Sequence, residues 1–350
     1  MNAHDRSEDA GFCHFARYSM SRPSGRYLRS TSRHQYSHRH LGMEQTMQSV
    51  TFPTDDQRML TGNLHLPEDF DPAGSYPAIV VAHPAGGVKE QTAGLYAGRL
   101  AEQGFIALAA DASYQGESGG APHFLEDPYA RVEDVRAAVD YLQSLDYVDA
   151  ERIGALGICA GGGYTVNATM TDHRIKALAT VSAFNMGTGF RRDWYGLNPD
   201  SAAAAVLDEA AKQRTAEAQG AEPATAPYVP AEIDENTNRD MREAHEYYLT
   251  SRAQHPNTKN QFLFTRSFSK IAAFDAFHLV EDLLTQPILI VAGSEAGSLW
   301  HSTELYSRAR SPKKLVVVDG GTHMDFYDIP QYVDRAVAEA TPFFNENLAR

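Results

Sequence analysis

Cysteine is scarce in this sequence, and long apolar runs and an excess of positive charge are absent. Only two cysteines occur among the 350 residues, and one of them, Cys13, lies in a polar N-terminal stretch. Two cysteines so placed do not form a disulfide framework, which favours a reducing, cytoplasmic setting. No stretch approaches the roughly 18 apolar residues needed to cross a bilayer, so no membrane association is expected. The net charge of −14 argues against nucleic acid as a partner, because such binding depends on Lys and Arg neutralising phosphates.

The first 42 residues differ in composition from the rest. They contain seven Arg, no Lys, seven Ser and only three acidic residues, and they show no apolar periodicity. An Arg- and Ser-rich, acid-poor leader is typical of an organelle transit peptide. A disordered tail, or a start placed upstream of Met43 or Met47, fits better because no clear amphipathic helix can be drawn. Residues 1–46 are therefore predicted to be a leader or disordered extension, with the folded domain spanning 47–345.

From Met47 onward, strand and helix patterns alternate. QSVTFPT and MLTGNLHLP flank a polar turn and predict an antiparallel hairpin. YPAIVVAHP, FIALAAD and PILIVAG are continuous apolar runs of strand length, which is typical of strands buried on both faces. RVEDVRAAVDYLQSL places its apolar residues at helical spacing. The alternation predicts an α/β fold, a mostly parallel central sheet flanked by helices, with its chemistry at the carboxyl ends of the strands.

Residues from about 187 to 283 interrupt this alternation. They contain an Ala-rich helix pattern from Ser201 to Gln219, a Pro/Ala linker and a second helix pattern, NRDMREAHEYYLTSR. We expect a helical cap inserted between two strands of the core. Trp194 and Tyr195 in the cap, and Trp300 after it, are predicted either to contact an apolar acyl or ring-bearing substrate or to pack a small core of the cap.

The stretch RIGALGICAGGGY joins an apolar strand to a glycine-lined helix start at Cys159. Its G-I-C-A-G segment fits the nucleophile-elbow pattern, a sharp strand-to-helix turn. Such a turn leaves room only for very small residues two positions before and after the nucleophile, here Gly157 and Gly161. Free N–H groups at the start of the helix favour thiolate over thiol. The pattern predicts a nucleophilic Cys159, and a buried structural cysteine is the alternative.

Two further segments fit a nucleophile at this corner. HPAGG (83–87) follows a predicted strand and is typical of the loop that supplies one oxyanion-hole amide. The backbone N–H groups of Ala85 and Ala160 are expected to converge on a developing oxyanion. His323 follows the last predicted strand, which is the chain position of the general base that serves an elbow nucleophile.

Six segments together carry a resemblance to a known family: HPAGGVKEQT, DASYQGESGG, GICAGGGY, AFDAFH, AGSEA and DGGTHMDFYD. The chain resembles the α/β-hydrolase superfamily, and within it the dienelactone-hydrolase-like branch, which uses a cysteine in the elbow. The likeness runs from about Thr51 to Phe344 and is closest to a subgroup of bacterial hydrolases and fungal polyketide-tailoring hydrolases and acyltransferases. It implies an α/β-hydrolase fold with a cap.

The sequence departs from that subgroup at the acid of the triad. The resemblance implies an Asp two residues after the Glu of AGSEA, and that position is Gly297. Glu295 is the nearest remaining carboxylate and is predicted to orient His323, with the loop after VSAF as another source of an acid. A thiol with a pKa of about 8.5 needs little help to ionise, so a Cys–His pair tolerates this loss better than a Ser would.

The HPAGG loop also lacks the Glu of dienelactone hydrolases proper, which argues against dienelactone as the substrate. Glu117 is either a contact to the site or a solvated turn residue.

These features predict a cysteine-dependent hydrolase that cleaves a small to medium, largely apolar ester or thioester through a covalent acyl-enzyme. Acyl transfer to an alcohol or amine, and a ligand-binding homologue without turnover, are the alternatives. A redox-sensing thiol ranks last, because the core offers no resolving cysteine. No metal-ligand spacing and no phosphate-binding loop occurs, so no metal and no cofactor is expected. The expected partner is a small-molecule substrate, and the sequence leaves open whether the chain forms a homo-oligomer.

Overall fold

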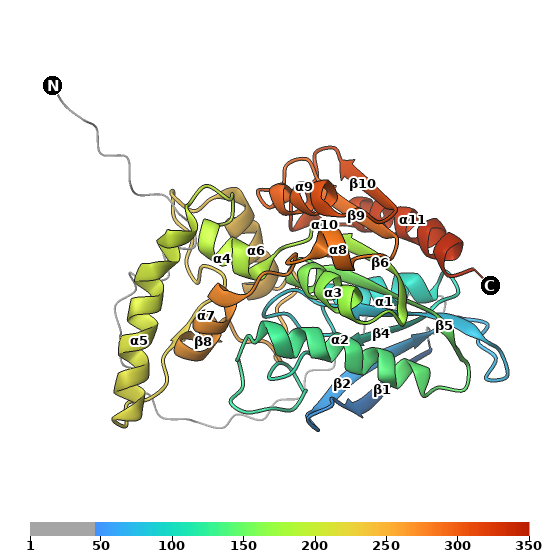
Figure 1. Cartoon of the computed structure of the whole chain (residues 1–350), viewed down its shortest axis with the longest axis horizontal. Helices are drawn as coiled ribbons and strands as arrows, with labels where there is room; N and C mark the ends of the chain where they lie inside the picture. Colours follow the sequence, from blue (N-terminus) through green and yellow to red (C-terminus); the bar gives the residue numbers. More distant parts are fainter. Residues whose placement is uncertain (1–45, 350) are drawn as a thin grey trace.

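An eight-stranded sheet forms the centre of the molecule. The computed structural model describes residues 46–349, and the strand order in this sheet is β1-β2-β4-β3-β5-β6-β9-β10 (Figure 1). The strands are β1 (Thr46–Pro53), β2 (Met59–Leu66), β3 (Tyr76–Ala82), β4 (Ile106–Ala110), β5 (Val148–Ile158), β6 (Ile175–Val181), β9 (Ile288–Gly293) and β10 (Lys313–Val318). The extension predicted for residues 1–46 lies outside the described residues, apart from Thr46, where β1 begins.

The direction of the strands divides the sheet into two parts. β1 and β2 form the predicted antiparallel hairpin, and β2 pairs with β4 in the antiparallel sense as well. All neighbours from β4 across to β10 are parallel. The prediction of a mostly parallel sheet is confirmed. Because the parallel strands share one direction, their carboxyl ends meet at one edge, where the segments after β3, β5, β9 and β10 come together.

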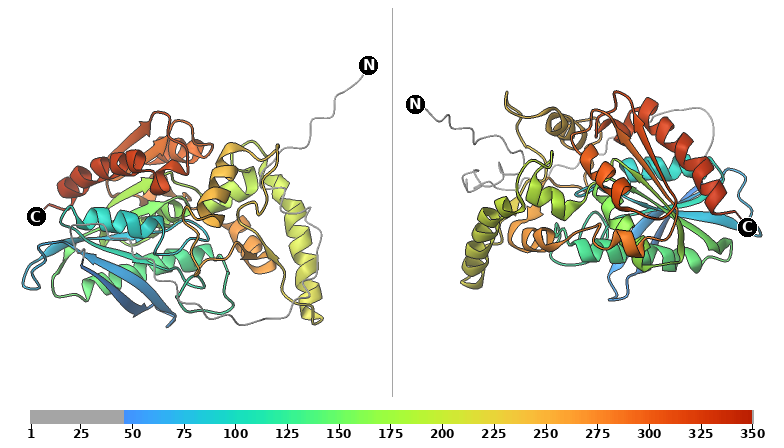
Figure 2. Two further views of the ribbon diagram at one scale, coloured as in Figure 1. Left: turned by 180° about the vertical axis from the view of Figure 1, so that it is seen from behind. Right: turned by 45° about the horizontal axis from the view of Figure 1, so that its top comes forward.

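Helices cover both faces of the sheet. α1 (Thr92–Ala101) and α11 (Pro330–Asn347) contact each other on one face, while α2 (Pro128–Gln143) and α3 (Ala160–Thr171) contact each other on the other (Figures 1 and 2). α9 (Leu299–Arg308) packs against β9 and β10. Every residue of β9 is buried, as two-sided coverage requires. This coverage explains why the central strands read as unbroken apolar runs.

Between β6 and β9 the chain leaves the sheet and forms a group of short elements. They are α4 (Met186–Arg192), a 3₁₀ turn (Asp200–Ala203), α5 (Ala204–Ala218), β7 (Thr225–Ala226), α6 (Arg239–Leu249), β8 (Phe262–Leu263), α7 (Phe264–Ala273) and α8 (Val280–Leu283). α4 to α7 gather beyond one end of the sheet, with α5 farthest from the core (Figures 1 and 2). In α5 only Val206 and Ala210 are buried, which suits an exposed Ala-rich helix. We call this group the cap.

Candidate active site

Cys159 makes the turn between strand β5 and helix α3. β5 ends at Ile158 and α3 begins at Ala160, so the cysteine alone forms the corner. Its backbone has φ +54° and ψ −123°, and a positive φ is strained for a residue that carries a side chain. The Cys159 N–H donates to the carbonyl oxygen of Val181, 3.0 Å away, which ties the corner to the end of β6. This is the geometry of a nucleophile elbow.

Gly157 and Gly161 lie where the elbow folds back on itself. A Cβ on Gly157 would lie 2.3 Å from the carbonyl oxygen of Gly161. A Cβ on Gly161 would lie 2.3 Å from the carbonyl oxygen of Ala82, the last residue of β3. Both distances are well below van der Waals contact, so only glycine fits at these positions without a backbone shift.

The loop after β3 is fixed beside the elbow by buried polar contacts. The ring nitrogen Nε2 of His83 accepts a hydrogen bond from the N–H of Ala112 at 3.0 Å, and the His83 carbonyl accepts one from Arg131 at 2.6 Å. Ala85, farther along this loop, and Ala160 border the same pocket as Cys159. The Ala160 N–H also hydrogen-bonds the Cys159 sulfur. The two residues predicted to supply the oxyanion hole thus border the pocket that holds the thiol.

A buried ion-pair cluster holds the next part of this loop. Lys89 Nζ lies 2.9 Å from a carboxylate oxygen of Asp111 and 2.6 Å from one of Glu117. Asp111 also accepts the backbone N–H of Lys89 at 2.8 Å. Lys89 and Asp111 are fully buried, whereas the Glu117 side chain is 55% exposed. Glu117 is therefore a partner of Lys89, and it does not border the pocket.

His323 lies in the segment after β10 and is completely buried. Its Nδ1 is 2.5 Å from the hydroxyl oxygen of Ser298, and its Nε2 is 3.3 Å from the hydroxyl oxygen of Tyr327. The edge of the Trp194 ring system packs against the imidazole, with the ring centroids 4.8 Å apart. Burial lowers the pKa of His323 to about 3, so the imidazole is neutral at pH 7. In the described part of the chain, the structure gives His323 no carboxylate partner.

The prediction that Glu295 orients His323 is wrong. The carboxylate of Glu295 is 55% exposed and lies 3.5 Å from Arg239 of the cap. Its backbone N–H pairs with the carbonyl of Gly321, and in this turn its side chain is exposed to solvent. Ser298, three residues farther on and 1% exposed, contacts His323 instead. A neutral hydroxyl thus takes the place in which a carboxylate was expected.

A cap carboxylate fills the space beside Gly297. The Gly297 N–H donates to Oδ2 of Asp240, on α6, at 2.8 Å, and the indole N–H of Trp194 donates to the same oxygen at 2.5 Å. A Cβ on Gly297 would lie 2.6 Å from that oxygen. Asp240 is 2% exposed, and its burial raises the pKa of the carboxyl group. The resemblance implies an Asp at position 297, but the carboxylate of Asp240, from the cap, occupies the space beside that position.

Tyr327 is a residue of the site that was not predicted from the sequence. It lies in the short helix α10 (Asp325–Asp328), and its hydroxyl group hydrogen-bonds the Cys159 sulfur and contacts His323. The spacing of four residues between His323 and Tyr327 is a signal that could have found it, because side chains four apart lie on one face of a helical turn. Ser298 has only a weak signal, a polar residue shortly after a buried strand.

The thiol and the imidazole are both uncharged at rest. Burial raises the pKa of the Cys159 thiol to about 11, although hydrogen bonds with Tyr327 and the Ala160 N–H act in the opposite direction. With the pKa of His323 near 3, neither group is ionised near pH 7. The site therefore holds a neutral thiol–imidazole pair and not the thiolate that the helix start led us to expect. If the sulfur attacks a substrate, proton transfer has to accompany that attack.

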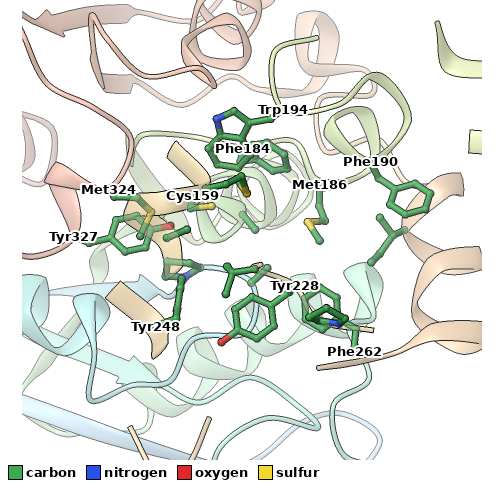
Figure 3. Close-up of a pocket in the computed structure, with 18 of the residues that line it drawn as sticks. Cys159, Phe184, Met186, Phe190, Trp194, Tyr228, Tyr248, Phe262, Met324 and Tyr327 are labelled. Atoms are coloured by element: carbon green, nitrogen blue, oxygen red, sulfur yellow. The ribbon is translucent and has the colours of Figure 1, made fainter. Parts of the chain in front are cut away.

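An apolar pocket opens onto the Cys159 sulfur. Its outline holds about 670 Å³ of space between atoms, open solvent included, and no Asp, Glu, Lys or Arg among residues 46–349 borders it. Cys159 and Tyr327 border one side, while Phe190 and Phe262 lie on the opposite side (Figure 3). The cap supplies most of the wall, with Met186, Phe190, Tyr228, Met241, Phe262, Phe268 and Ile271. A pocket with this lining suits an apolar ligand.

Only one of the three aromatic residues predicted to bind substrate borders this pocket. Trp194 does, and its ring also packs on Phe184 at a centroid distance of 5.0 Å. Tyr195 is 42% exposed and does not border the pocket. Trp300 supports the wall from outside, because its indole N–H donates to the Trp194 carbonyl at 3.0 Å. Contact with a substrate in this pocket is therefore corrected for Tyr195 and Trp300, whereas Trp300 packs against the cap, which is the other role that the sequence left open.

Within residues 46–349, no group of three or more His, Cys, Asp or Glu side chains is arranged to hold a metal ion. Over the same range, no helix combines the length and the apolar character that crossing a bilayer requires.

The strand order and the elbow at Cys159 give the chain the α/β-hydrolase fold. Its structure aligns with the crystal structure of protein PA2218 from Pseudomonas aeruginosa with a TM-score of 0.82 and 32% identity, covering 88% of this chain and 95% of PA2218. It also aligns with the α/β hydrolase GrgF from Penicillium sp. sh18 with a TM-score of 0.72, covering 87% of this chain and 99% of GrgF. At 21% identity, the likeness to GrgF concerns the fold alone.

Relatives by sequence narrow the class. Protein YcjY of Escherichia coli K12 is 49% identical over 290 residues, 83% of this chain and 94% of YcjY. The chain belongs to the same family as YcjY, and its residues 66–188 match the Dienelactone hydrolase family, as the resemblance implied. Thiohydrolase aneE of Aspergillus aculeatus is 31% identical over 53% of this chain and 56% of aneE. Polyketide transferase claH of Penicillium crustosum is 26% identical over 79% of this chain and 90% of claH.

His301 is a buried histidine next to the site, and we expect it to make the stability of the folded protein depend on pH. Its ring packs edge-on against Phe184 at 4.4 Å, and among residues 46–349 neither ring nitrogen has a hydrogen-bond partner. Burial holds the pKa of His301 well below its usual value of 6.5. Below pH 6.5 the unfolded chain binds a proton on His301 that the folded protein does not bind. For this group, the free energy of unfolding therefore decreases by about 1.4 kcal/mol for each unit by which the pH is lowered.

A single substitution isolates this contribution from those of the other titrating groups. Relative to the native chain, His301→Phe is expected to gain about 1.4 kcal/mol of unfolding free energy for each pH unit below 6.5. Urea unfolding of both proteins at pH 7, 6 and 5 measures this difference. A difference that stays constant over these three pH values would contradict the prediction.

Proposed function

We propose that the chain is a hydrolase that cleaves an ester or thioester through an acyl-enzyme on Cys159. The observation that carries this proposal is the placement of the thiol at a strained strand-to-helix corner, at the wall of an apolar pocket. Strain of this kind is retained where it serves a site, and here it turns the sulfur toward the space in which a substrate carbonyl fits. The match of residues 66–188 to the Dienelactone hydrolase family supports a hydrolytic reaction.

Two half-reactions describe the chemistry. In the first, Cys159 Sγ bonds to the substrate carbonyl carbon, the thiol proton passes to His323, and the amides of Ala85 and Ala160 hold the oxyanion. As the tetrahedral intermediate collapses, the leaving alcohol or thiol takes a proton from His323. In the second, water attacks the acyl carbon, gives a proton to His323, and the released sulfur recovers that proton. Atoms and charges balance in each half.

The pocket favours a neutral, largely apolar acyl group. A charged group in the pocket would lie against walls to which residues 46–349 contribute no charged side chain, and the loss of its hydration would be uncompensated. The aliphatic and aromatic lining suits an apolar chain or a substituted ring. The likeness to a fungal protein named thiohydrolase supports a thioester as one form of the substrate.

Acyl transfer to an alcohol or amine is the second candidate. The name of the relative claH, polyketide transferase, supports it, and so does the burial of the reacting groups. Cys159 is 8% exposed and His323 0%, so once an acyl group fills the pocket little room is left for water. An acyl-enzyme protected from water in this way reacts only with a nucleophile that itself binds in the pocket.

Intact mass after brief exposure to activated esters and acyl thioesters of graded chain length tests the proposal. The native chain is expected to gain the mass of one acyl group, and Cys159→Ala none. Loss of the adduct in water alone supports hydrolysis, whereas loss only with an added alcohol or amine supports transfer. No adduct across the series would reject the acyl-enzyme, and a ligand-binding homologue without turnover would then be tested by thermal shift.

A further inference from the structure

The hydroxyl group of Tyr327 lies between the nucleophile and the base. Its oxygen is 3.3 Å from His323 Nε2 and hydrogen-bonds the Cys159 sulfur. Within the described residues, the structure gives no direct hydrogen bond between Cys159 and His323. Tyr327 borders the pocket, as Figure 3 shows beside Cys159, whereas His323 does not. The phenol is thus the group that links the thiol to the imidazole.

The surroundings of Tyr327 hold this hydroxyl group in place. Its backbone N–H donates to the carbonyl of Met324 at 3.1 Å, and the residue is 2% exposed. The rings of Tyr247 and Tyr248, both on α6, meet the Tyr327 ring edge-on at centroid distances of 5.0 and 6.3 Å. A ring enclosed in this way has little freedom to swing out of the path between sulfur and imidazole.

We propose that Tyr327 is a catalytic residue that relays the thiol proton from Cys159 to His323. The proposal rests on the proposed function, in which Cys159 is acylated. As Sγ bonds to the carbonyl carbon, the S–H proton moves to the Tyr327 oxygen while the Tyr327 proton moves to Nε2 of His323. Tyr327 stays neutral, the imidazole becomes positive and the oxyanion negative. The same path runs in reverse when the leaving group takes its proton.

The imidazole and the phenol are suited to these two roles. Relay to Nε2 requires the proton of the resting imidazole to be on Nδ1, where Ser298 Oγ, 2.5 Å away, accepts it. Burial raises the pKa of Tyr327 well above its ordinary value of 10, so the phenol passes a proton on and does not hold a negative charge. Two further charged groups act on the thiol: Arg131 favours the thiolate and Glu126 opposes it. They form an ion pair at 3.3 Å, so their effects on the sulfur largely cancel.

Tyr327→Phe removes the hydroxyl group and keeps the ring. We expect acylation by a p-nitrophenyl ester to slow about 100-fold, which is the scale of a lost proton-transfer partner. We also expect the pH profile of Cys159 alkylation by iodoacetamide to move to higher pH, because the thiolate loses a hydrogen-bond donor. A residue that acted only by packing would leave that profile in place.

Tyr96→Phe is the matched control. The Tyr96 hydroxyl is also fully buried and donates to the carbonyl of Phe326, the residue before Tyr327, at 2.9 Å. It contacts neither Cys159 nor His323, so acylation and alkylation are expected to stay within about twofold of the native chain. An acylation rate in Tyr327→Phe that also stays within about twofold would overturn the relay.

A proton inventory on the native chain tests the relay without any substitution. In mixtures of H₂O and D₂O, two protons moving together give a curved dependence of the acylation rate on deuterium content, and one proton gives a straight line. A straight line would overturn the relay. If no ester acylates the native chain, the proposed function fails. Alkylation profiles that coincide in the native chain and Tyr327→Phe would show separately that Tyr327 does not act on the thiol.

Discussion

Cys159→Ser is expected to slow acyl-enzyme formation by about 1000-fold or more. In a serine enzyme of this fold, a carboxylate on Nδ1 of the histidine stabilises the imidazolium that forms during attack. Here Nδ1 faces the neutral hydroxyl of Ser298, and burial lowers the pKa of His323 to about 3. A base this weak removes a proton only from a group more acidic than an alcohol. The thiol meets that need, even with its pKa raised to about 11, and a serine hydroxyl does not.

Stopped-flow measurement of the acylation burst with a p-nitrophenyl ester checks this prediction, with Cys159→Ala as the blank. The serine oxygen is smaller than sulfur and fits the same elbow, so the melting temperature is expected to stay near that of the native chain. A serine variant that acylates within tenfold of the native rate would contradict the argument. It would mean that His323 gains a carboxylate partner when substrate binds.

Gly161→Ala is expected to abolish more than 99% of the activity and to lower the free energy of unfolding by about 3 kcal/mol. The new Cβ would lie 2.3 Å from the Ala82 carbonyl oxygen and 2.7 Å from that of His83. Both neighbours are backbone atoms, so no side-chain rotation relieves the clash. The strand end and the elbow would have to separate, and that movement would carry Ala85 away from the sulfur.

Gly162→Ala is the matched control, one position along the same helix. Its new Cβ would lie 3.2 Å from its nearest neighbours, in Ala183 and Gly157, which a small adjustment relieves. We expect its stability to change by about 1 kcal/mol or less and its activity to stay within threefold of native. Acylation rates and urea midpoints of the two variants measured side by side give the comparison. Equal behaviour would show that the close approach of β3 to α3 is not what requires glycine at position 161.

The sequence was sufficient for the core of the fold, because the core follows from local patterns. Continuous apolar runs predicted the buried strands, and the alternation with helices predicted parallel pairing. The hairpin of β1 and β2 followed from two alternating segments around a polar turn. The pair β7 and β8 was missed, since each strand has only two residues and its pairing depends on contacts across the cap.

The site divides in the same way. Cys159 and its glycines lie in one pentapeptide, whose local geometry demands those residue types, so the elbow was predictable from the motif. The partners of His323 depend on side-chain directions in segments that are far apart in the chain. The chain position of Glu295 fits the acid that orients His323, yet the Glu295 side chain is exposed. Ser298, three residues farther along the chain, contacts the His323 ring instead. No periodic pattern in the sequence indicates which of Glu295 and Ser298 faces His323.

The contact between Asp240 and Gly297 has a consequence for how the family can vary. The two positions are 57 residues apart, and one carboxylate occupies the space between them. A Cβ at 297 would lie 2.6 Å from that carboxylate, so aspartate at both positions would place two negative charges in one buried site. The two positions therefore exclude each other, and a chain that gains an acid at 297 has to change residue 240. Covariation between them across homologues would record an exchange of the acid between the core and the cap.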